Sequence, residues 1–377
     1  MKETKVRQSN FELMRIVSMF FIALCHFLVH GNILNNSEGI VNNLSYLIIS
    51  FALVHVDSFV LLTGYFNYNK DFKLSRIFKV NNSMWFYRVL YLLLAIFVFS
   101  FSFSKTAIIQ FLSPIPRITD YWFLIVYIML CLVSTILNLT IKNSTKETHK
   151  KIIIALLFIN ILSFFTNNDF YSLNNGFSLF SFILLYYVGS YLHKYTFNNE
   201  NKKTVEKNKK RAIICLSLYA VVSVINFSLF LICKKLMISD HLIIQYYSRI
   251  FIDGFQSYLN PLVLLSTVLY FIFFSQLKFK NRIINFYGKY ILGVYLLTDC
   301  YLARTIIYKE LGFNLKSYSI KHLFIAIGLS IAMIIVLPLF EFVRTKIFEF
   351  FYNRKLAKKN RENIQKLIYK TGINVKW

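Results

Sequence analysis

The sequence has few of the residues that interrupt helices or cross-link a chain. Its 377 residues include only 11 glycines, 4 prolines and 5 cysteines. The small number of glycines and prolines leaves few places where a long helix would break. The cysteines lie in or beside apolar stretches, without the spacing of a zinc site, so we expect buried thiols rather than disulfides or zinc ligands.

Acidic residues are also scarce, since 17 of them stand against 43 lysines and arginines and give a net charge of +26. A nucleic-acid partner would be one explanation, but the basic residues sit in short loops between apolar blocks, and we therefore expect no nucleic acid. The even-numbered loops are rich in Lys and Arg, whereas the first and fifth loops contain neither. By the positive-inside rule, this alternation predicts that both termini are cytoplasmic.

Long apolar blocks are what the sequence has in abundance. Hydrophobic residues make up 56% of the chain, including 40 Phe and 25 Tyr, and they occur in blocks of about twenty, the length that crosses a bilayer as a helix. The sequence therefore predicts an all-α, polytopic integral membrane protein. We expect about ten transmembrane helices, at about Phe11–Gly31, Leu44–Phe66, Met84–Phe103, Tyr121–Ile141, Ile152–Thr166, Phe177–Tyr195, Ala212–Cys233, Tyr258–Gln276, Phe286–Tyr308 and His322–Ile347. They would form one membrane domain over residues 1–350, followed by a basic cytoplasmic tail over residues 351–377.

The first apolar block is unusual because it contains Glu12, Arg15, His26 and His30. Ionisable groups at membrane depth are costly and usually face a bundle interior or a water-filled cavity. Arg15 and His26 are separated by close to three helical turns, so both should lie on one face of the helix, about 16 Å apart along its axis. This pattern indicates a functional helix rather than a simple membrane anchor.

Basic residues near the predicted cytoplasmic side form a candidate phosphate site. Arg15 and Arg88 fall within about 6 Å of the predicted inner helix ends, and Lys73, Arg76 and Lys79 lie just outside the membrane. Arginine suits phosphate recognition, so these residues could bind a phosphorylated cytoplasmic donor. The alternative is that they only snorkel to the membrane surface and fix the topology.

Three ionisable residues are predicted near the middle of the membrane: His26, Asp57 and Asp299. A histidine beside a carboxylate is suited to general-base catalysis, because the carboxylate fixes the tautomer and stabilises the imidazolium. Asp57 could instead pair with Arg15, and the whole set could be a polar lock between helices. His26 and His30 have an i, i+4 spacing, but the sequence between them lacks the Glu of a zinc protease, so we expect no metal.

The loop before the eighth predicted helix combines charge with aromatic residues. Arg249 and Asp253 are four residues apart, and several aromatic residues, including Tyr258, surround them. Such a loop could cradle a sugar, or it could be an interfacial helix with an aromatic belt.

Five motifs, in order along the chain, resemble those of the membrane acyltransferase-3 family. The first is Arg15 followed after ten residues by His26. The others are VDSFVLLTGYF (Val56–Phe66), YWFL (Tyr121–Leu124), LNPLVLLS (Leu259–Ser266) and GKYILGVYLL (Gly288–Leu297). The resemblance implies a ten-helix enzyme that moves an acyl group, usually acetyl from cytoplasmic acetyl-CoA, to a hydroxyl of an extracytoplasmic glycan. His26 would be the catalytic base, and Arg15 would help to bind the donor or shape the site.

Two departures from the family pattern change the expected residue roles. The family often has Arg-x-x-Arg before its third helix, where this chain has Arg76 and Lys79, which weakens a bidentate phosphate contact. The family also often has a His where this chain has Thr298 followed by Asp299. No fused soluble domain is evident, so we expect the protein to acylate the acceptor itself or to need a separate partner of polysaccharide biosynthesis.

Our prediction is a bacterial plasma-membrane O-acyltransferase acting on a cell-surface polysaccharide or its lipid-linked precursor, with membrane lipid around it. The catalytic candidates are His26, Asp57 and Arg15, with Arg15, Thr63 or a tyrosine as the oxyanion stabiliser. The candidates for acetyl-CoA are Lys73, Arg76, Lys79 and Arg88, and those for the acceptor are Trp122, Arg249, Asp253, Tyr258 and Asp299. The alternative is a transporter or flippase for a lipid-linked saccharide, with the same polar groups lining its pathway.

Overall fold

The computed structural model describes residues 7–70, 73–114, 118–166, 173–197, 205–313 and 315–352. The described segments are helices and connecting turns, without a strand, as the sequence predicts. The helices are α1 (Ser9–His30), α2 (Gly39–Ala52), α3 (Val54–Asn67), α4 (Leu74–Phe97), α5 (Lys105–Leu112), α6 (Ile118–Asn143), α7 (Lys146–Thr166), η2 (Asn174–Gly176), α8 (Leu179–Tyr191), η3 (Leu192–Phe197), α9 (Val205–Leu236), α10 (Leu242–Asp253), α11 (Pro261–Gln276), α12 (Arg282–Tyr290), α13 (Leu292–Thr298), α14 (Tyr301–Thr305), η4 (Ile306–Glu310) and α15 (Ile320–Tyr352).

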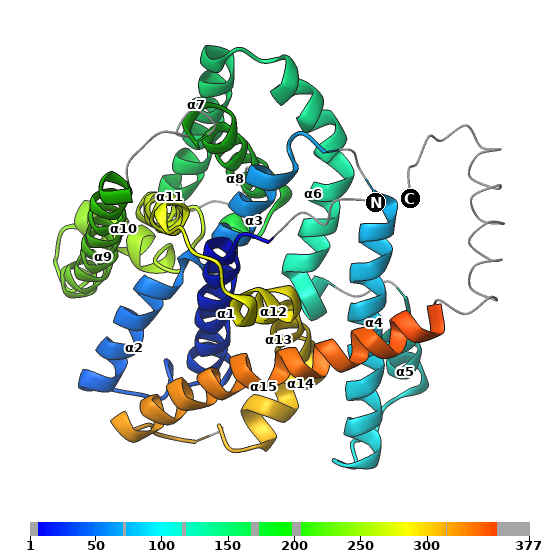
Figure 1. Cartoon of the computed structure of the whole chain (residues 1–377). Coiled ribbons are helices and arrows are strands. Elements are labelled where there is room, and N and C mark those ends of the chain that lie inside the picture. Colours follow the sequence, from blue (N-terminus) through cyan, green and yellow to red (C-terminus); the bar gives the residue numbers. More distant parts are fainter. Residues whose placement is uncertain are drawn as a thin grey trace.

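Helix α1 occupies the middle of the bundle (Figure 1). It packs against α2, α3, α11, α12, α13 and α15. Polar bonds between helices reinforce this packing, since the Ser18 hydroxyl of α1 lies 2.8 Å from that of Ser58 in α3 and 3.2 Å from that of Tyr270 in α11. Bonds of this kind hold membrane helices in register, because lipid supplies little hydrophobic drive for helix association.

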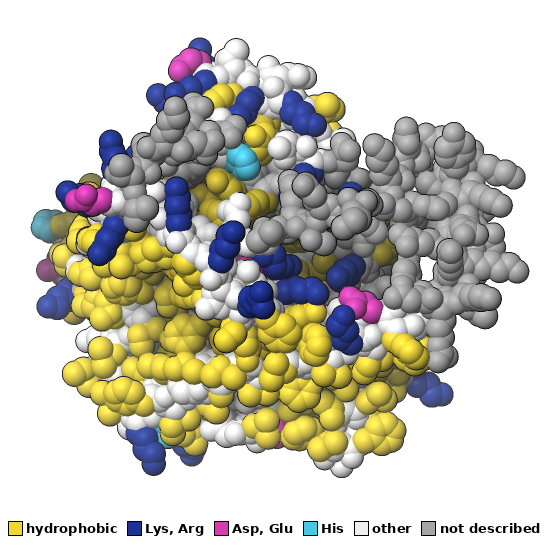
Figure 2. All heavy atoms as spheres, in the orientation of Figure 1, with side chains coloured by type: hydrophobic (Ala, Val, Ile, Leu, Met, Phe, Trp, Pro, Cys, Tyr) yellow, Lys and Arg dark blue, Asp and Glu magenta, His cyan; other side chains and the backbone are white. Residues whose placement is uncertain are grey.

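The structure is that of a multi-pass membrane protein. In the described ranges, seven helices are long and apolar enough to cross a membrane when α2 and α3 are taken together as one, and α12 to η4 would form an eighth span if the bent pair is one. The sixth and eighth predicted spans correspond to the shorter helices α8 and α11. Large apolar side chains cover much of the visible surface, as expected of a lipid-facing surface (Figure 2). The count of ten spans and the cytoplasmic location of both termini stay predictions. Of the predicted tail, only residues 351 and 352 are among the described residues.

Helices α3 and α8 lie unusually close together because each contributes a glycine to their interface. A Cβ atom on Gly64 would collide with the backbone of Tyr186, and one on Gly189 would collide with the carbonyl oxygen of Leu61. Small residues permit such backbone approach between membrane helices. This contact places the middle of α3 firmly beside the two pockets described below.

The predicted ninth span is not one helix, because it bends by 76° between Thr298 and Tyr301. A break at membrane depth frees backbone carbonyls, which must find other partners. The hydroxyl of Tyr91 donates to the carbonyl of Leu297 at 2.5 Å, and that of Tyr121 donates to the carbonyl of Leu296 at 2.7 Å. These donors from α4 and α6 stabilise the break. The predicted second span is also interrupted, at Leu53 between α2 and α3.

Helix α4 begins ten residues earlier than its predicted span, at Leu74 rather than Met84. Arg88 therefore lies about 20 Å along the helix from its start, rather than close to the predicted inner end. The segment after α4 turns back along it, with the Trp85 indole N–H donating to the carbonyl of Leu112 at 2.9 Å. Helix α5 belongs to this returning segment and was not predicted.

Candidate active site

Two pockets lie beside α1, one along each half of the helix. The His26 pocket, of about 420 Å³, is lined by His26, His30, Asp299, Tyr295, Trp122 and Tyr258 among others. The Arg15 pocket, of about 850 Å³, is lined by Arg7, Glu12, Arg15, Lys70, Arg76 and Lys289 among others.

The two pockets share three apolar lining residues: Phe59 of α3, Phe123 of α6 and Leu292 of α13. The ring centroids of Phe59 and Phe123 are 6.2 Å apart. We call these residues the apolar partition. Because these side chains line both pockets, the two pockets adjoin one another at this point.

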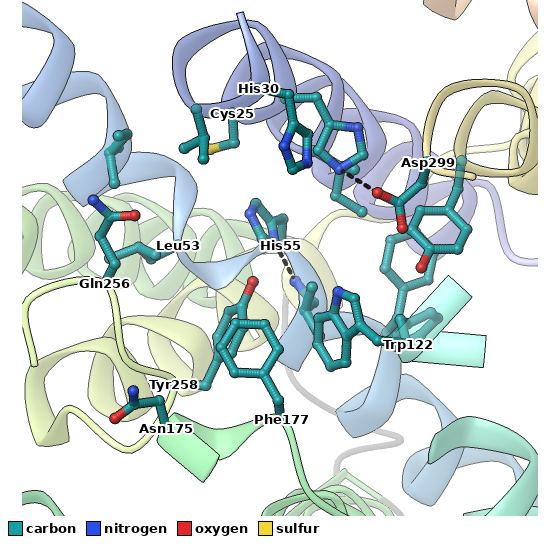
Figure 3. A pocket seen from close by; sticks show the side chains of 18 of the residues that line it. Cys25, His30, Leu53, His55, Trp122, Asn175, Phe177, Gln256, Tyr258 and Asp299 are labelled. Carbon is teal, nitrogen blue, oxygen red and sulfur yellow. Dashed lines mark hydrogen bonds and ion pairs between the residues drawn. The ribbon is translucent and has the colours of Figure 1, made fainter. Parts of the chain in front are cut away.

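A histidine and a carboxylate meet at one end of the His26 pocket (Figure 3). His26 Nε2 lies 3.4 Å from Asp299 Oδ1. Asp299 is 2% exposed, and it ends α13 at the break before α14. The same carboxylate oxygen lies 3.3 Å from Arg304 Nε, which also donates to the Asp299 carbonyl at 2.8 Å. Arg304 therefore holds the carboxylate in place and neutralises part of its charge.

The other nitrogen of His26 faces a hydroxyl. His26 Nδ1 lies 3.5 Å from Thr298 Oγ1, whose proton is donated to the Val294 carbonyl at 2.9 Å. The hydroxyl of Tyr295 is buried and has no hydrogen-bond partner among the described residues, while its ring centroid lies 6.5 Å from that of His26. The site thus brings together an imidazole, a carboxylate and a buried phenolic hydroxyl, a set of groups suited to proton transfer.

The wall facing this end of the His26 pocket is aromatic. The Trp122 and Phe177 ring centroids are 4.4 Å apart, and that of Tyr258 lies 5.2 Å from Phe177 and 6.1 Å from Trp122. The backbone of Asn175 has a left-handed φ of 52°, and its carbonyl accepts from the Tyr258 N–H at 3.0 Å. That bond ties the turn before α8 to the loop before α11 and so assembles the wall.

The Arg15 pocket is strongly basic, with one acidic residue, Glu12, among its described lining residues. Glu12 Oε1 lies 2.8 Å from Arg7 Nη1 and 2.7 Å from Arg15 Nη1. The shared carboxylate holds the two guanidinium groups side by side. Arg76 and Lys289 add positive charge from α4 and α12, and such a cluster is suited to phosphate.

The structure brings some of the predicted site residues to the two pockets. Arg15 and Arg76 line the Arg15 pocket, and His26, Asp299, Trp122, Asp253 and Tyr258 line the His26 pocket. Thr63, predicted as a possible oxyanion donor, lines the Arg15 pocket and donates to the Phe59 carbonyl at 2.8 Å.

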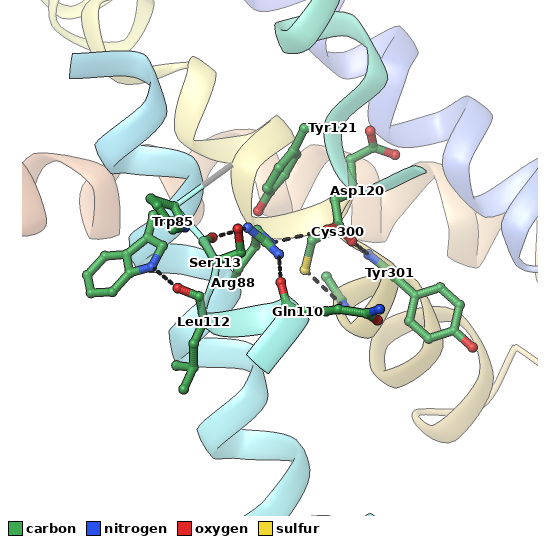
Figure 4. A network of polar contacts seen from close by, with 12 residues as sticks. Trp85, Arg88, Gln110, Leu112, Ser113, Asp120, Tyr121, Cys300 and Tyr301 are labelled. Carbon is green, nitrogen blue, oxygen red and sulfur yellow. Dashed lines mark hydrogen bonds and ion pairs between the residues drawn. The ribbon is translucent and has the colours of Figure 1, made fainter. Parts of the chain in front are cut away.

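Other predicted site residues lie elsewhere. Arg88 is 1% exposed and holds the C-terminal end of α5, donating to the carbonyls of Gln110 at 2.6 Å and Ser113 at 2.9 Å. It also pairs with Asp120 at 3.1 Å (Figure 4). Lys73 and Lys79 are exposed on α4 and its N-cap. These three residues are not among those lining the Arg15 pocket.

Asp57 and Arg249 are also not brought to the His26–Asp299 pair. Asp57 is buried near the start of α3, and its Oδ2 has no hydrogen-bond partner among the described residues. The carboxylate beside His26 is Asp299, and the one that pairs with Arg15 is Glu12, so neither predicted pairing of Asp57 is found in the described ranges. Arg249 pairs with Asp253 at 3.7 Å on the exposed face of α10.

The sequence reasoning missed Arg304, Tyr295 and the pairing role of Glu12, and it named Thr298 only as a departure from the family pattern. Arg304 offered a signal, since it is a charged residue inside the predicted ninth span. Glu12 offered one as well, being three residues before Arg15 on one helix. Tyr295 offered no such signal, because nothing in the sequence distinguishes it from the other tyrosines among the 25 in the chain.

The His26 pocket also has a geometry that could hold a metal ion. One ligand atom each from His26, His30 and Asp299 lie within 4.8 Å of one another. The prediction that the protein uses no metal is not tested by this geometry.

The comparisons with known proteins agree with this architecture. The acyltransferase domain described for the acyltransferase-3 family matches residues 8–341, which include the lining residues of both pockets except Arg7. No curated protein and no solved structure matches the chain. The match covers most of the chain, and the motifs that carry the resemblance contribute some of the lining residues of each pocket, among them His26 and Trp122 in one and Arg15 and Thr63 in the other. The chain therefore belongs to the acyltransferase-3 family, a family of membrane enzymes that transfer acyl groups.

Proposed function

We propose that the protein transfers an acetyl group from cytoplasmic acetyl-CoA to a hydroxyl of a cell-surface polysaccharide or its lipid-linked precursor, in a bacterial plasma membrane. The observation that carries the proposal is the order of the two pockets along α1. The Arg15 pocket and the His26 pocket meet at the apolar partition. A donor and an acceptor arriving from opposite sides of the membrane need two such openings, with the catalytic base where they meet.

The charge of the Arg15 pocket supports its assignment to the donor. Arg7, Arg15 and Arg76 line it together with Lys70 and Lys289, and Lys70 belongs to a loop that the positive-inside rule places in the cytoplasm. Coenzyme A carries several phosphate groups, and guanidinium groups bind phosphate with paired hydrogen bonds. The thioester end would then extend toward the apolar partition.

The contacts of His26 support its role as the base. With the proton of the neutral ring on Nε2, Asp299 accepts it and Nδ1 is free to take the proton of the attacking hydroxyl. The hydroxyl oxygen forms a bond with the acetyl carbonyl carbon, and the carbon–sulfur bond breaks. His26 then returns the proton to the departing thiolate, which gives free coenzyme A. The unused hydroxyl of Tyr295 is suited to stabilise the negative charge on the carbonyl oxygen.

The aromatic wall supports a saccharide acceptor. Trp122, Phe177 and Tyr258 offer flat apolar rings to the C–H face of a sugar, and such rings contribute binding area with little loss of side-chain entropy. Polar groups of Asn175 and Gln256 line the same pocket and could bind sugar hydroxyls. Convergent polar groups in a mostly apolar pocket are typical of small-molecule sites.

The test uses the full chain purified into lipid vesicles, with acetyl-CoA on one side and polysaccharide or lipid-linked saccharide on the other. We expect acetylated glycan together with an equal amount of free thiol. His26→Gln keeps the side-chain size and should reduce the rate by about 10²–10⁴-fold through the loss of general-base catalysis. The matched control is His241→Gln, since His241 is exposed at the N-cap of α10. Normal acetylation by His26→Gln would contradict the proposal.

The alternative, transport of a lipid-linked saccharide, is favoured by one observation. The span that contains Asp299 is broken at membrane depth, as helices around transporter sites often are. The same vesicles separate the two functions. Movement of the lipid-linked saccharide across the membrane without acetyl-CoA and without product would favour transport.

A further inference from the structure

His30 has no part in the acyl transfer proposed above, yet it lies beside the base. It follows His26 by one helical turn, and their ring centroids are 5.1 Å apart. One ligand atom each from His26, His30 and Asp299 lie within 4.8 Å of one another. All three residues line the same pocket, so a small ion in the pocket can reach them together (Figure 3).

Two imidazoles and a carboxylate form a ligand set with a clear chemical preference. Imidazole nitrogen favours transition metals such as Zn²⁺ over Mg²⁺ or Ca²⁺, which prefer oxygen ligands. Zinc accepts nitrogen and carboxylate ligands at about 2.0–2.2 Å and leaves a fourth position for water. The ligand atoms must draw closer than they are here, and His30, which is only partly buried, is the residue whose side-chain torsions can change to allow this.

We propose that the His26 pocket binds one divalent transition-metal ion of the Zn²⁺ type through His26, His30 and Asp299, and that this ion inhibits the enzyme. The inhibition rests on the proposed function, because it follows from His26 being the base. A metal bound through Nε2, the nitrogen that faces Asp299, leaves the proton of the neutral ring on Nδ1, which then has no lone pair for the hydroxyl proton. The binding itself does not depend on that function.

Arg304 is the charged neighbour that opposes a cation. Its Nε lies 3.3 Å from Asp299 Oδ1, but the guanidinium is also held by the Asp299 carbonyl at 2.8 Å and the Asp120 carbonyl at 3.4 Å. A carboxylate has about four lone-pair sites, and Asp299 Oδ2 is buried without a hydrogen-bond partner among the described residues. The carboxylate can therefore bind the arginine and an ion at the same time.

Binding is tested first, by titrating ZnCl₂ into the purified full chain and measuring the stoichiometry and affinity by competition with a chromogenic chelator. We expect one ion per chain. Loss of a residue that only supports a metal ligand typically weakens metal binding by roughly 10–100-fold. His30→Gln removes a ligand itself and should therefore weaken zinc binding by at least that factor. The control is His55→Gln, since His55 lines the same pocket but belongs to α3. Absence of zinc binding, or equal binding by His30→Gln and the unchanged protein, would overturn the inference.

Inhibition is tested separately in the vesicle assay, with each variant compared with its own zinc-free rate. Zinc should stop acetyl transfer by the unchanged protein, and a chelator should restore it. His30→Gln should need at least about tenfold more zinc for the same inhibition, by the loss of one ligand. If zinc binds with an affinity that depends on His30 but does not inhibit acetyl transfer, the binding site is confirmed, and both the proposed inhibition and the role of His26 as base are refuted.

Discussion

The replacement of Asp299 by Asn removes one negative charge and keeps the shape of the side chain. Asp299 Oδ1 lies 3.4 Å from His26 Nε2, and at an effective dielectric constant near 20, opposite charges at this distance attract by about 5 kcal/mol. The amide dipole of Asn retains part of that attraction for the imidazolium that forms during the reaction. Because each 1.4 kcal/mol is a factor of ten, we expect kcat to fall by about 10²–10³-fold.

The fold should survive this change. Arg304 loses a charged partner, but it keeps the carbonyl of residue 299 at 2.8 Å and that of Asp120 at 3.4 Å. Membrane abundance should therefore remain close to that of the unchanged protein. The KM for acetyl-CoA should change by no more than about twofold, because a residue that acts only in the transition state lowers kcat without weakening donor binding.

The assay measures kcat and KM for acetyl transfer in vesicles, with Asp57→Asn as the matched carboxylate-to-amide variant. Asp57 is buried on α3 and is not among the residues that line the His26 pocket, so Asp57→Asn should reduce kcat less than Asp299→Asn does. A kcat for Asp299→Asn within about tenfold of normal would refute the argument, since that loss is below the range expected for a general base and its partner. A larger loss for Asp57→Asn would move the orienting role to that residue.

Three further predictions concern the donor, the acceptor and the fold. Arg76→Glu should raise the KM for acetyl-CoA strongly and Arg76→Gln mildly and in a salt-dependent way; an unchanged KM in both would place the phosphate site elsewhere. Trp122→Ala should raise the KM for the glycan by about 2–10-fold, since an aromatic contact is worth about 0.5–1.5 kcal/mol, and an equal effect on acetyl-CoA would contradict its place in the acceptor wall. Gly64→Ala forces α3 away from Tyr186 and should lower the free energy of unfolding by about 1–3 kcal/mol, measured by thermal or denaturant unfolding. Gly328→Ala is the control, because an added Cβ there meets nothing within 4 Å. Equal stability of the two variants would refute the close α3–α8 contact.

The sequence predicts where most helices run, because an apolar block of sufficient length can satisfy its backbone in lipid only as a helix. It does not predict where helices break. The break at Asp299 depends on Tyr91 and Tyr121, whose hydroxyls bind the freed carbonyls of α13 from helices distant in the sequence. The early start of α4 at Leu74 was missed because the polar residues of its first turns do not resemble a membrane span.

The sequence also predicts the pairing of His26 with a carboxylate, since an ionisable residue at membrane depth needs a partner. It cannot choose between Asp57 and Asp299, because spacing along one helix does not say which other helix faces it. Arg88 shows the same limit, since only the packed structure reveals that the C-terminal end of α5 returns to bind it. The grouping of Trp122 with Phe177 and Tyr258 likewise depends on a turn at Asn175 that the sequence reasoning did not foresee.

The apolar partition has a consequence for the energy balance of a cell. A bacterium stores free energy as an electrochemical proton gradient, and a continuous water-filled passage through a membrane protein would discharge it. Phe59, Phe123 and Leu292 lie where the two pockets meet, and hydrophobic constrictions of this kind exclude water and ions. An acetyl group with its slender thioester is apolar enough to pass such a seal, whereas a hydrated proton is not. In the proposed function, the residues that let the acyl group through would therefore also act as electrical insulation, and we expect small replacements there to make the membrane conduct protons even when no acyl transfer takes place.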